Sequence, residues 1–278
     1  MTWWCAASTE PWSWSPRAYP GIWLFMGLLL VGYLLAYRMA PAASADDRRK
    51  RWFFLAGWAL LWLSTDWPLG TLGAGYLATA HMTQYILYTM GAAPLLILGL
   101  PEWMLRRFLS RLRAYRLVSV LARPLVAGLV FNLVLVATHA PITVDNLRTS
   151  EIGSFALDVA WLFSGLLLWL PVCGSLDELK PSLPVRGVYL FLAAGLVPMV
   201  PGGFLTFSAT PLYAVYELAP RVNDFDALDD QQAAGAIMKI GNLPLLWPVL
   251  AALFVRWANQ DKTPTPKVAS SRAPTTTT

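Results

Sequence analysis

Long apolar runs constrain this chain more than any other feature of its sequence. A membrane core of ~30 Å is crossed by about 20 apolar residues in a helix. About seven runs approach that length, at roughly 20–38, 51–65, 75–100, 117–138, 152–172, 185–206 and 231–256. The run at 51–65 is the shortest and reaches only ~22 Å at 1.5 Å per residue. The sequence therefore predicts an all-α polytopic membrane protein with about seven transmembrane helices.

The composition agrees with a membrane location. Hydrophobic residues make up 56% of the chain and charged residues only 13%, which is far more apolar than a soluble domain of 278 residues. Many of the 14 tryptophans lie near the ends of apolar runs, as in "TWWCAASTEPWSWS" and "WLSTDWPLG", where interfacial aromatic belts occur. The basic charge balance therefore requires no nucleic-acid partner.

The distribution of positive charge predicts the orientation. If all seven runs cross the membrane, all of the 21 Lys and Arg residues fall on one side, with the exception of Arg17, Arg148, Arg221 and Lys239. Omitting the run at 51–65 would place the two arginine-rich loops on opposite sides, so this run is retained. By the positive-inside rule, the N-terminus is expected outside and the C-terminus in the cytoplasm.

The chain divides into three expected regions. Residues 1–19 form a Trp-rich outer segment, 20–257 the helical domain, and 258–278 a disordered cytoplasmic tail rich in Thr and Pro. No cleavable signal peptide is expected before the first run, because prolines interrupt this segment and no basic region precedes an apolar one. Cys5 and Cys173 are expected on opposite sides of the membrane, which excludes a disulfide between them.

Polar residues gather near the outer ends of the predicted helices. His81 stands near the outer end of the third predicted helix, and His139 begins an outer loop. Both histidines of the chain therefore map to the outer side. Met82 follows His81, and thioether and imidazole groups together suit Cu(I). Ligation and ordinary interfacial packing both remain open for these side chains. A polar stripe at helical spacing begins with the first histidine: His81, Gln84, Tyr85 and Tyr88.

Two charged residues fall inside predicted spans. Asp158 and Lys239 lie at ~9 Å and ~12 Å from the outer ends of their helices. A charge in the membrane costs roughly 2.5–3.5 kcal/mol on insertion scales and is usually paired or functional. Their similar depth predicts an Asp158–Lys239 ion pair.

Several segments together resemble a known family. "HMTQYILYTMGAAPLLILGLP", "THAP", "GLLLWLP" and "SATPLYAVY…DDQQAAGAIM" occur in this order over residues 50–257. In the order and spacing of these segments the chain resembles the CtaG family of bacterial cytochrome c oxidase assembly proteins. This is the polytopic type, which is linked to copper-containing haem-copper oxidases. The resemblance implies a multi-pass protein of the bacterial cytoplasmic membrane.

The resemblance also implies a metal site. The family pattern has a second histidine four residues after the first, where this chain has Tyr85. It has a histidine pair in the fifth helix, where this chain has Ser154 and Asp158. His81 and His139 match the family motif. The implied copper ligands are therefore His81 and His139, with Met82 and Asp158 as supplementary ligands.

Three functions follow as hypotheses. The first is a non-enzymatic assembly factor that supports copper insertion or maturation of a haem-copper oxidase. The second is a metal-free helical subunit or partner of another respiratory complex, and the third is a copper transporter. The expected partners are oxidase or other respiratory subunits and membrane lipid. No enzyme is expected, because the outer side offers no nucleophile beside a base.

Overall fold

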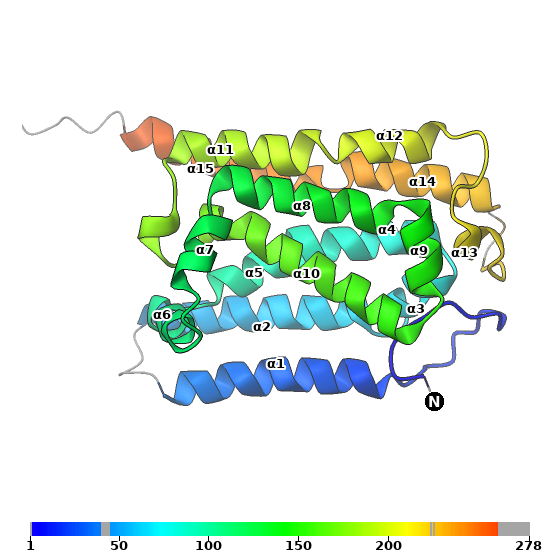
Figure 1. Cartoon of the computed structure of the whole chain (residues 1–278), viewed down its shortest axis with the longest axis horizontal. Coiled ribbons are helices and arrows are strands. Elements are labelled where there is room, and N and C mark those ends of the chain that lie inside the picture. The colour runs from blue at the N-terminus through cyan, green and yellow to red at the C-terminus, as the bar shows by residue number, and fades with distance from the viewer. Residues whose placement is uncertain (1, 40–44, 223, 225, 261–278) are drawn as a thin grey trace, which may run out of the picture.

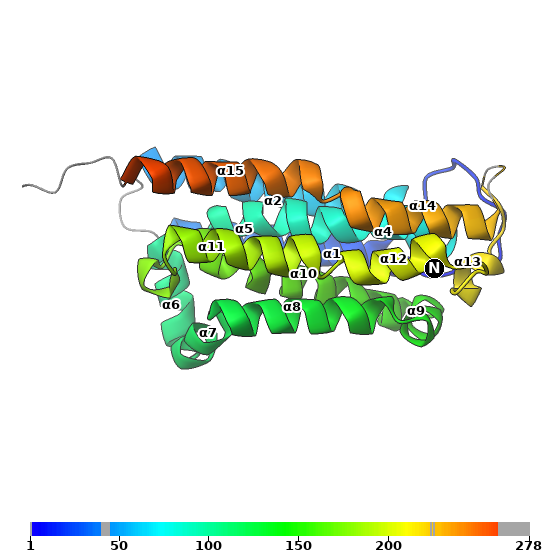
Figure 2. The ribbon, with the colours of Figure 1, turned by 90° about the horizontal axis from the view of Figure 1, so that it is seen from above.

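The longer helices of this protein lie side by side along one axis (Figures 1 and 2). The computed structural model describes residues 2–39, 45–222, 224 and 226–260, and these contain helices and connections but no strand. The view from the side and the view from above show the same alignment of the longer helices (Figures 1 and 2). The predicted all-α fold is therefore confirmed for the described part of the chain.

Most elements are α-helices, while η1 and η3 are π-helical turns and η2 is a 3-10 turn. The elements are α1 (Pro20–Arg38), α2 (Ala45–Thr65), α3 (Leu69–Gly75), α4 (Ala78–Ile86), η1 (Leu87–Ala92), α5 (Ala93–Leu98), α6 (Glu102–Arg111), α7 (Tyr115–Leu121), α8 (Pro124–His139), α9 (Pro141–Arg148), α10 (Glu151–Cys173), η2 (Asp177–Leu179), α11 (Leu183–Leu190), η3 (Phe191–Leu196), α12 (Met199–Phe207), α13 (Ala214–Glu217), α14 (Ala227–Ile240) and α15 (Leu243–Gln260).

The helices give four to six candidate membrane spans among the described residues. Four are long and apolar enough alone: α1, α10, Leu183–Phe207 and Ala227–Gln260. Two bent pairs raise the number to six, namely Ala78–Leu98 with α6 at 98° and α7 with α8 at 78°. The chain is thus a multi-pass membrane protein. The predicted run at 51–65, which is not among these six candidates, falls in α2, whose first two turns carry the charged stretch from Asp46 to Arg51.

The predicted helix at 75–100 is interrupted. α3 ends at Gly75, α4 begins at Ala78, and the π-helical turn η1 separates α4 from α5. Pro94 lies just after η1, and Pro198 lies just after η3. Proline cannot donate to the helical ladder, so the turn before it has to rearrange. Such π-helical turns occur often at functional sites.

Close helix contacts fix α10 against the segment that follows α4. A Cβ added at Gly165 would lie 2.9 Å from the Cα atom of Thr89, so only glycine permits this approach. The indole Nε1 of Trp169 donates to the carbonyl oxygen of Thr89 at 2.8 Å. η1 and α10 are therefore held in one register.

Asp230 holds the first turn of α4. Its carboxylate accepts hydrogen bonds from the backbone N–H groups of Ala78 at 2.6 Å and Thr79 at 3.2 Å. α14 begins instead at the cap provided by Asp226, whose side chain accepts from the Asp229 N–H at 2.8 Å. A buried carboxylate on α14 thus satisfies N–H groups that the start of α4 leaves free.

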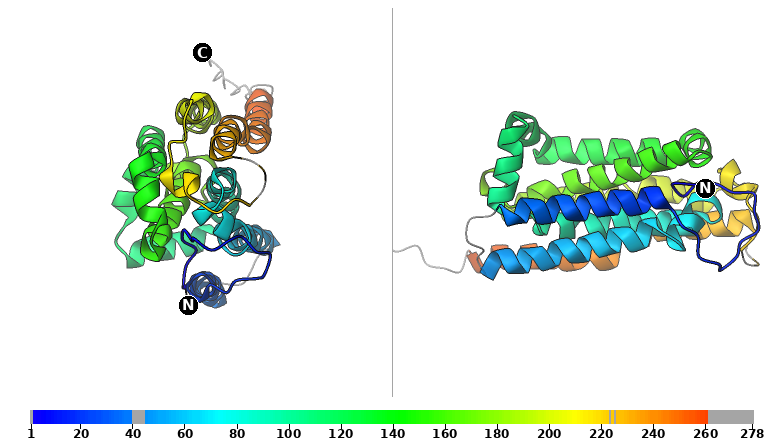
Figure 3. Two further views of the ribbon diagram at one scale, coloured as in Figure 1. Left: turned by 90° about the vertical axis from the view of Figure 1, so that its right-hand side faces the viewer. Right: turned by 90° about the horizontal axis from the view of Figure 1, so that it is seen from below.

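The two ends of the bundle differ. α6 and α7 lie at one end, whereas α3, α9 and α13 lie at the other (Figure 1), and the view from below agrees with this (Figure 3, right). The expected disordered tail falls, from residue 261 on, outside the described residues. Cys5 and Cys173 are both free thiols, as expected.

Candidate functional site

His81 lies at the end of the first turn of α4 and is 1% exposed. Its Nδ1 atom is 2.7 Å from the hydroxyl of Tyr216, and that hydroxyl is 2.6 Å from the carbonyl oxygen of Gly73. A carbonyl only accepts, and the phenol has a single proton. Both short contacts can be hydrogen bonds only if the Tyr216 hydroxyl donates to the Gly73 carbonyl and His81 Nδ1 donates to the Tyr216 hydroxyl. The Nε2 atom then carries a lone pair.

His139 ends α8 in an equivalent state. Its Nδ1 atom lies 2.8 Å from the carbonyl oxygen of Leu135, so Nδ1 must be the donor. Its Nε2 atom is therefore unprotonated. Among the described residues, neither His139 Nε2 nor His81 Nε2 has a hydrogen-bond partner, although both atoms are buried. Each imidazole is thus fixed by one nitrogen and leaves the other with a free lone pair.

The two imidazoles lie close together around Trp161. Their ring centroids are 5.6 Å apart. The Trp161 ring centroid lies 4.8 Å from that of His81 and 5.8 Å from that of His139. Tyr85 packs edge-on to His139 at 4.7 Å. Metal-binding histidines typically donate their second ring nitrogen to a backbone carbonyl or similar acceptor, as both do here. The pair therefore has the hydrogen bonding of metal ligands.

The remaining residues of the predicted stripe pack or form hydrogen bonds. Gln84 accepts from the Arg148 guanidinium at 3.5 Å, and the Tyr88 hydroxyl lies 2.5 Å from that of Thr65. Tyr85 and Tyr88 both contact Trp161, with centroids at 5.4 Å and 6.0 Å. The stripe thus forms one wall of the cluster around the histidines.

Asp158 has a different partner from the predicted one. Its Oδ1 atom lies 3.1 Å from Nη1 of Arg148, and its Oδ2 atom accepts from the Trp4 indole at 2.9 Å. Lys239 instead places its ammonium group 4.8 Å from the ring centroid of Phe207. The predicted Asp158–Lys239 pair was wrong because Arg148, which reads as an outer-loop residue, folds into the protein from the end of α9.

Arg148, Trp161 and Trp4 are the site residues that the sequence analysis missed. The guanidinium carbon of Arg148 lies 5.0 Å from the Trp161 ring centroid and thus close to the histidine pair. A tryptophan in an apolar helix or a Trp-rich segment looks like any interfacial residue. The useful signal was the uneven distribution of charge, since Arg148 was one of few basic residues on the outer side.

Met82 and Asp158 do not complete a larger metal cluster. Within the described residues, no group of three or more His, Cys, Asp or Glu side chains could hold a metal ion. Met82 is fully buried, but as the next residue after His81 it points about 100° away around the helix. The histidine pair is thus the part of the implied ligand set that combines free donor atoms with rings packed around one residue, Trp161.

Comparison with known proteins places the chain in a family. A family model described as cytochrome c oxidase caa3 assembly factor (Caa3_CtaG) matches residues 31–260, which include both histidines and every candidate span except the first turns of α1. Searches of curated proteins and of solved structures found no match. The expected resemblance is confirmed: this chain belongs to the Caa3_CtaG family of cytochrome c oxidase caa3 assembly factors.

Proposed function

We propose that this assembly factor supports the maturation of a haem-copper oxidase by holding one Cu(I) ion, as cargo, between His81 and His139. What carries the proposal is the pair of buried Nε2 lone pairs, which have no hydrogen-bond partner in the described part of the chain and belong to rings fixed through Nδ1. Imidazole nitrogen is a good copper ligand. Cu(I) accepts low coordination numbers, so a histidine pair is a sufficient ligand set.

Asp158 has an indirect role in this proposal. A copper ion near Arg148 would meet an unfavourable positive charge if that guanidinium were unpaired. The carboxylate of Asp158 lies against Arg148 and opposes this charge. We therefore assign Asp158 to charge balance, and Met82 to packing beside His81.

The proposed site lies toward the outer membrane face. We propose seven spans, with α2 as the additional one, the N-terminus outside and the C-terminus in the cytoplasm of a bacterial cell. The support is that α6 and α7, which carry most of the arginines between residues 102 and 123, lie at the bundle end opposite α3, α9 and α13 (Figure 1). Copper would then be released outside, toward an oxidase subunit.

A metal-free role is the second candidate. Every ring of the cluster makes aromatic contacts, and Arg148 lies beside Trp161, so the cluster is a compact structural core even without a metal. In that case the protein would assist oxidase assembly only by binding its subunits. Copper content of the oxidase separates the two candidates.

The test in cells uses a strain that lacks the gene and is complemented with variants. His81→Ala and His139→Ala are expected to yield oxidase that is depleted of copper, while Met82→Leu, a change of similar volume, retains it. Membrane levels of each variant are measured by immunoblot. Normal copper in the oxidase from both histidine variants would favour the metal-free role.

A further inference from the structure

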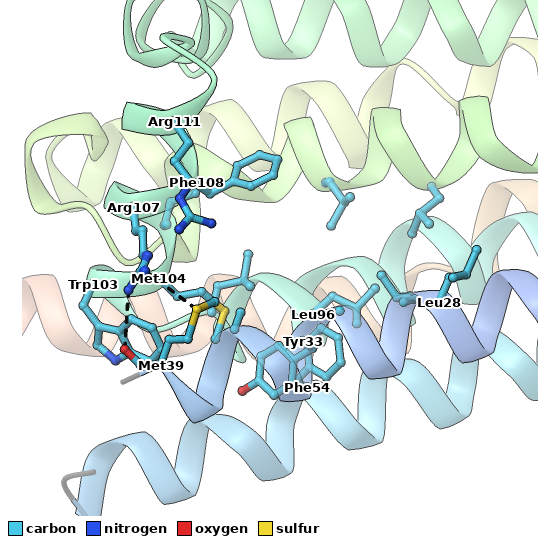
Figure 4. A pocket seen from close by; sticks show the side chains of 17 residues that line it. Leu28, Tyr33, Met39, Phe54, Leu96, Trp103, Met104, Arg107, Phe108 and Arg111 are labelled. Atoms are coloured by element: carbon cyan, nitrogen blue, oxygen red, sulfur yellow. Dashed lines mark hydrogen bonds between the residues drawn. The ribbon is translucent and has the colours of Figure 1, made fainter. Parts of the chain in front are cut away.

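An apolar groove of about 560 Å³, which includes neither histidine in its lining, opens between α1, α2, α5, α6 and α10. Leu28 marks one end, and α6 closes the other (Figure 4). The Tyr33 hydroxyl, which would otherwise be a polar group in the floor, is satisfied by donating to the Gly99 carbonyl oxygen at 3.0 Å. Leu28 is 65% exposed, so the groove is open to the hydrocarbon around the protein. Its interior suits a hydrocarbon chain.

Two arginines lie at the α6 end of the groove. α6 makes an angle of 98° with the preceding helix and so runs across the end of the bundle. Arg107 and Arg111 are four residues apart and therefore share one face of α6. Both line the groove, and Figure 4 shows them together at its end. The groove is thus apolar along its length and positively charged at one end.

These two arginines differ from their neighbour Arg106 in having no ion-pair partner among the described residues. Arg106, the neighbour, forms ion pairs with Glu102 and Glu178, both at 2.8 Å. Arg107 instead forms hydrogen bonds to Met39, with its Nη1 atom 3.5 Å from the carbonyl oxygen and its Nη2 atom 3.7 Å from the sulfur. Within the described part of the chain, no carboxylate lies within ion-pair distance of Arg107 or Arg111. Two guanidinium groups therefore remain available to an anion.

We propose that this groove binds an anionic phospholipid, with an acyl chain along Leu28 and Leu96 and the phosphate between Arg107 and Arg111. Guanidinium groups match phosphate geometry, and basic pockets at helix ends bind anionic headgroups. α6 lies at the level expected for headgroups, because it crosses the ends of the spans. The site is independent of the histidine pair and of copper binding.

Gly32 offers a way to fill the groove without disturbing the fold. It lines the groove, and a Cβ added there would meet no atom within 4 Å. Gly27, one and a half turns earlier on α1, is equally open but does not line the groove. Gly32→Phe therefore blocks the proposed acyl position, and Gly27→Phe is its matched control.

The experiment titrates the full-length protein, purified in detergent, with phosphatidylglycerol or phosphatidylcholine of the same acyl chains. Native mass spectrometry measures the bound lipid. The wild type is expected to prefer phosphatidylglycerol, and Arg107→Gln/Arg111→Gln to bind it roughly 30-fold more weakly. Arg113→Gln/Arg116→Gln removes equal charge just outside the groove and is expected to bind like the wild type.

Two results would overturn the proposal. Equal binding of the two lipids by the wild type would mean that the arginines do not select an anionic headgroup. An equal loss in both double-arginine variants, or in both Gly32→Phe and Gly27→Phe, would mean that lipid binding reflects general surface charge or general contact. A groove occupied by a partner helix rather than lipid would give the first of these results.

Discussion

The Nη1 atom of Arg148 lies 3.1 Å from Oδ1 of Asp158, and the two side chains are 0% and 2% exposed. Trp4 donates to the other carboxylate oxygen at 2.9 Å. One buried ion pair thus joins the N-terminal segment, the end of α9 and the second turn of α10. It also lies beside Trp161, which contacts both histidines. The framework of the histidine pair therefore depends on it.

Breaking this pair on one side leaves a buried charge uncompensated. Arg148→Met or Asp158→Leu alone is expected to lower the free energy of unfolding by about 3–5 kcal/mol. The double variant is expected to lose much less, because no charge remains. Thermal unfolding in detergent measures the difference, with the exposed Arg221→Met as control. Losses that simply add in the double variant would argue against the coupling.

Asp230 should stabilise α4 from outside that helix. Asp230→Ala removes the acceptor for the backbone N–H groups of Ala78 and Thr79, and the expected loss is about 1–2 kcal/mol. The neighbouring Asp229→Ala alters an exposed side chain and is expected to change stability little. Chemical unfolding of both variants checks this, and a matching loss in Asp229→Ala would contradict the role assigned to Asp230.

Tyr216 should tune metal binding by orienting His81. Tyr216→Phe keeps the ring but removes the acceptor of the Nδ1 proton, and losses of this kind weaken metal affinity by about 10–100-fold. Competition with a Cu(I) chelator measures the affinity. Tyr213→Phe is the matched control, because that hydroxyl donates to the His139 backbone carbonyl and contacts neither imidazole nitrogen. Unchanged affinity in Tyr216→Phe would show that the contact is only structural.

Cys5 is expected to be unreactive in the folded protein. Burial raises the pKa of the Cys5 thiol to about 12, so at pH 8 the nucleophilic thiolate is scarce. In a Cys173→Ser background, maleimide should modify Cys5 slowly in mild detergent and rapidly after unfolding in dodecyl sulfate. Mass spectrometry of the labelled protein checks this. Equal rates in both conditions would mean that Cys5 is accessible.

Much of the fold followed from the sequence because membrane helices reveal themselves by length and apolarity. The first span agrees with α1, and the fifth agrees with α10 to within a residue at either end. The interruptions were missed because a π-helical turn leaves no break in apolarity. α2 extends back through its charged turns because Asp46 pairs with Arg49 and Lys50 on the same helix.

The candidate site was only partly predictable. His81 and His139 stand out as the two histidines of an apolar chain, and their placement on one side follows from the topology. The ion-pair partner of Asp158 could not be predicted from the sequence, because the depth of a residue along its helix does not determine which neighbouring side chain faces it. Arg148 reaches Asp158 through the short turn between α9 and α10, a tertiary detail with no signature in spacing or composition.

The central claim is tested most directly by the copper content of the purified protein. Wild type and His81→Ala/His139→Ala are loaded anaerobically with Cu(I), desalted and analysed by elemental mass spectrometry, with folding checked by circular dichroism. The account predicts close to one copper per wild-type chain and a background level in the folded double variant. Background copper in the wild type, or equal copper in the two proteins, would contradict it.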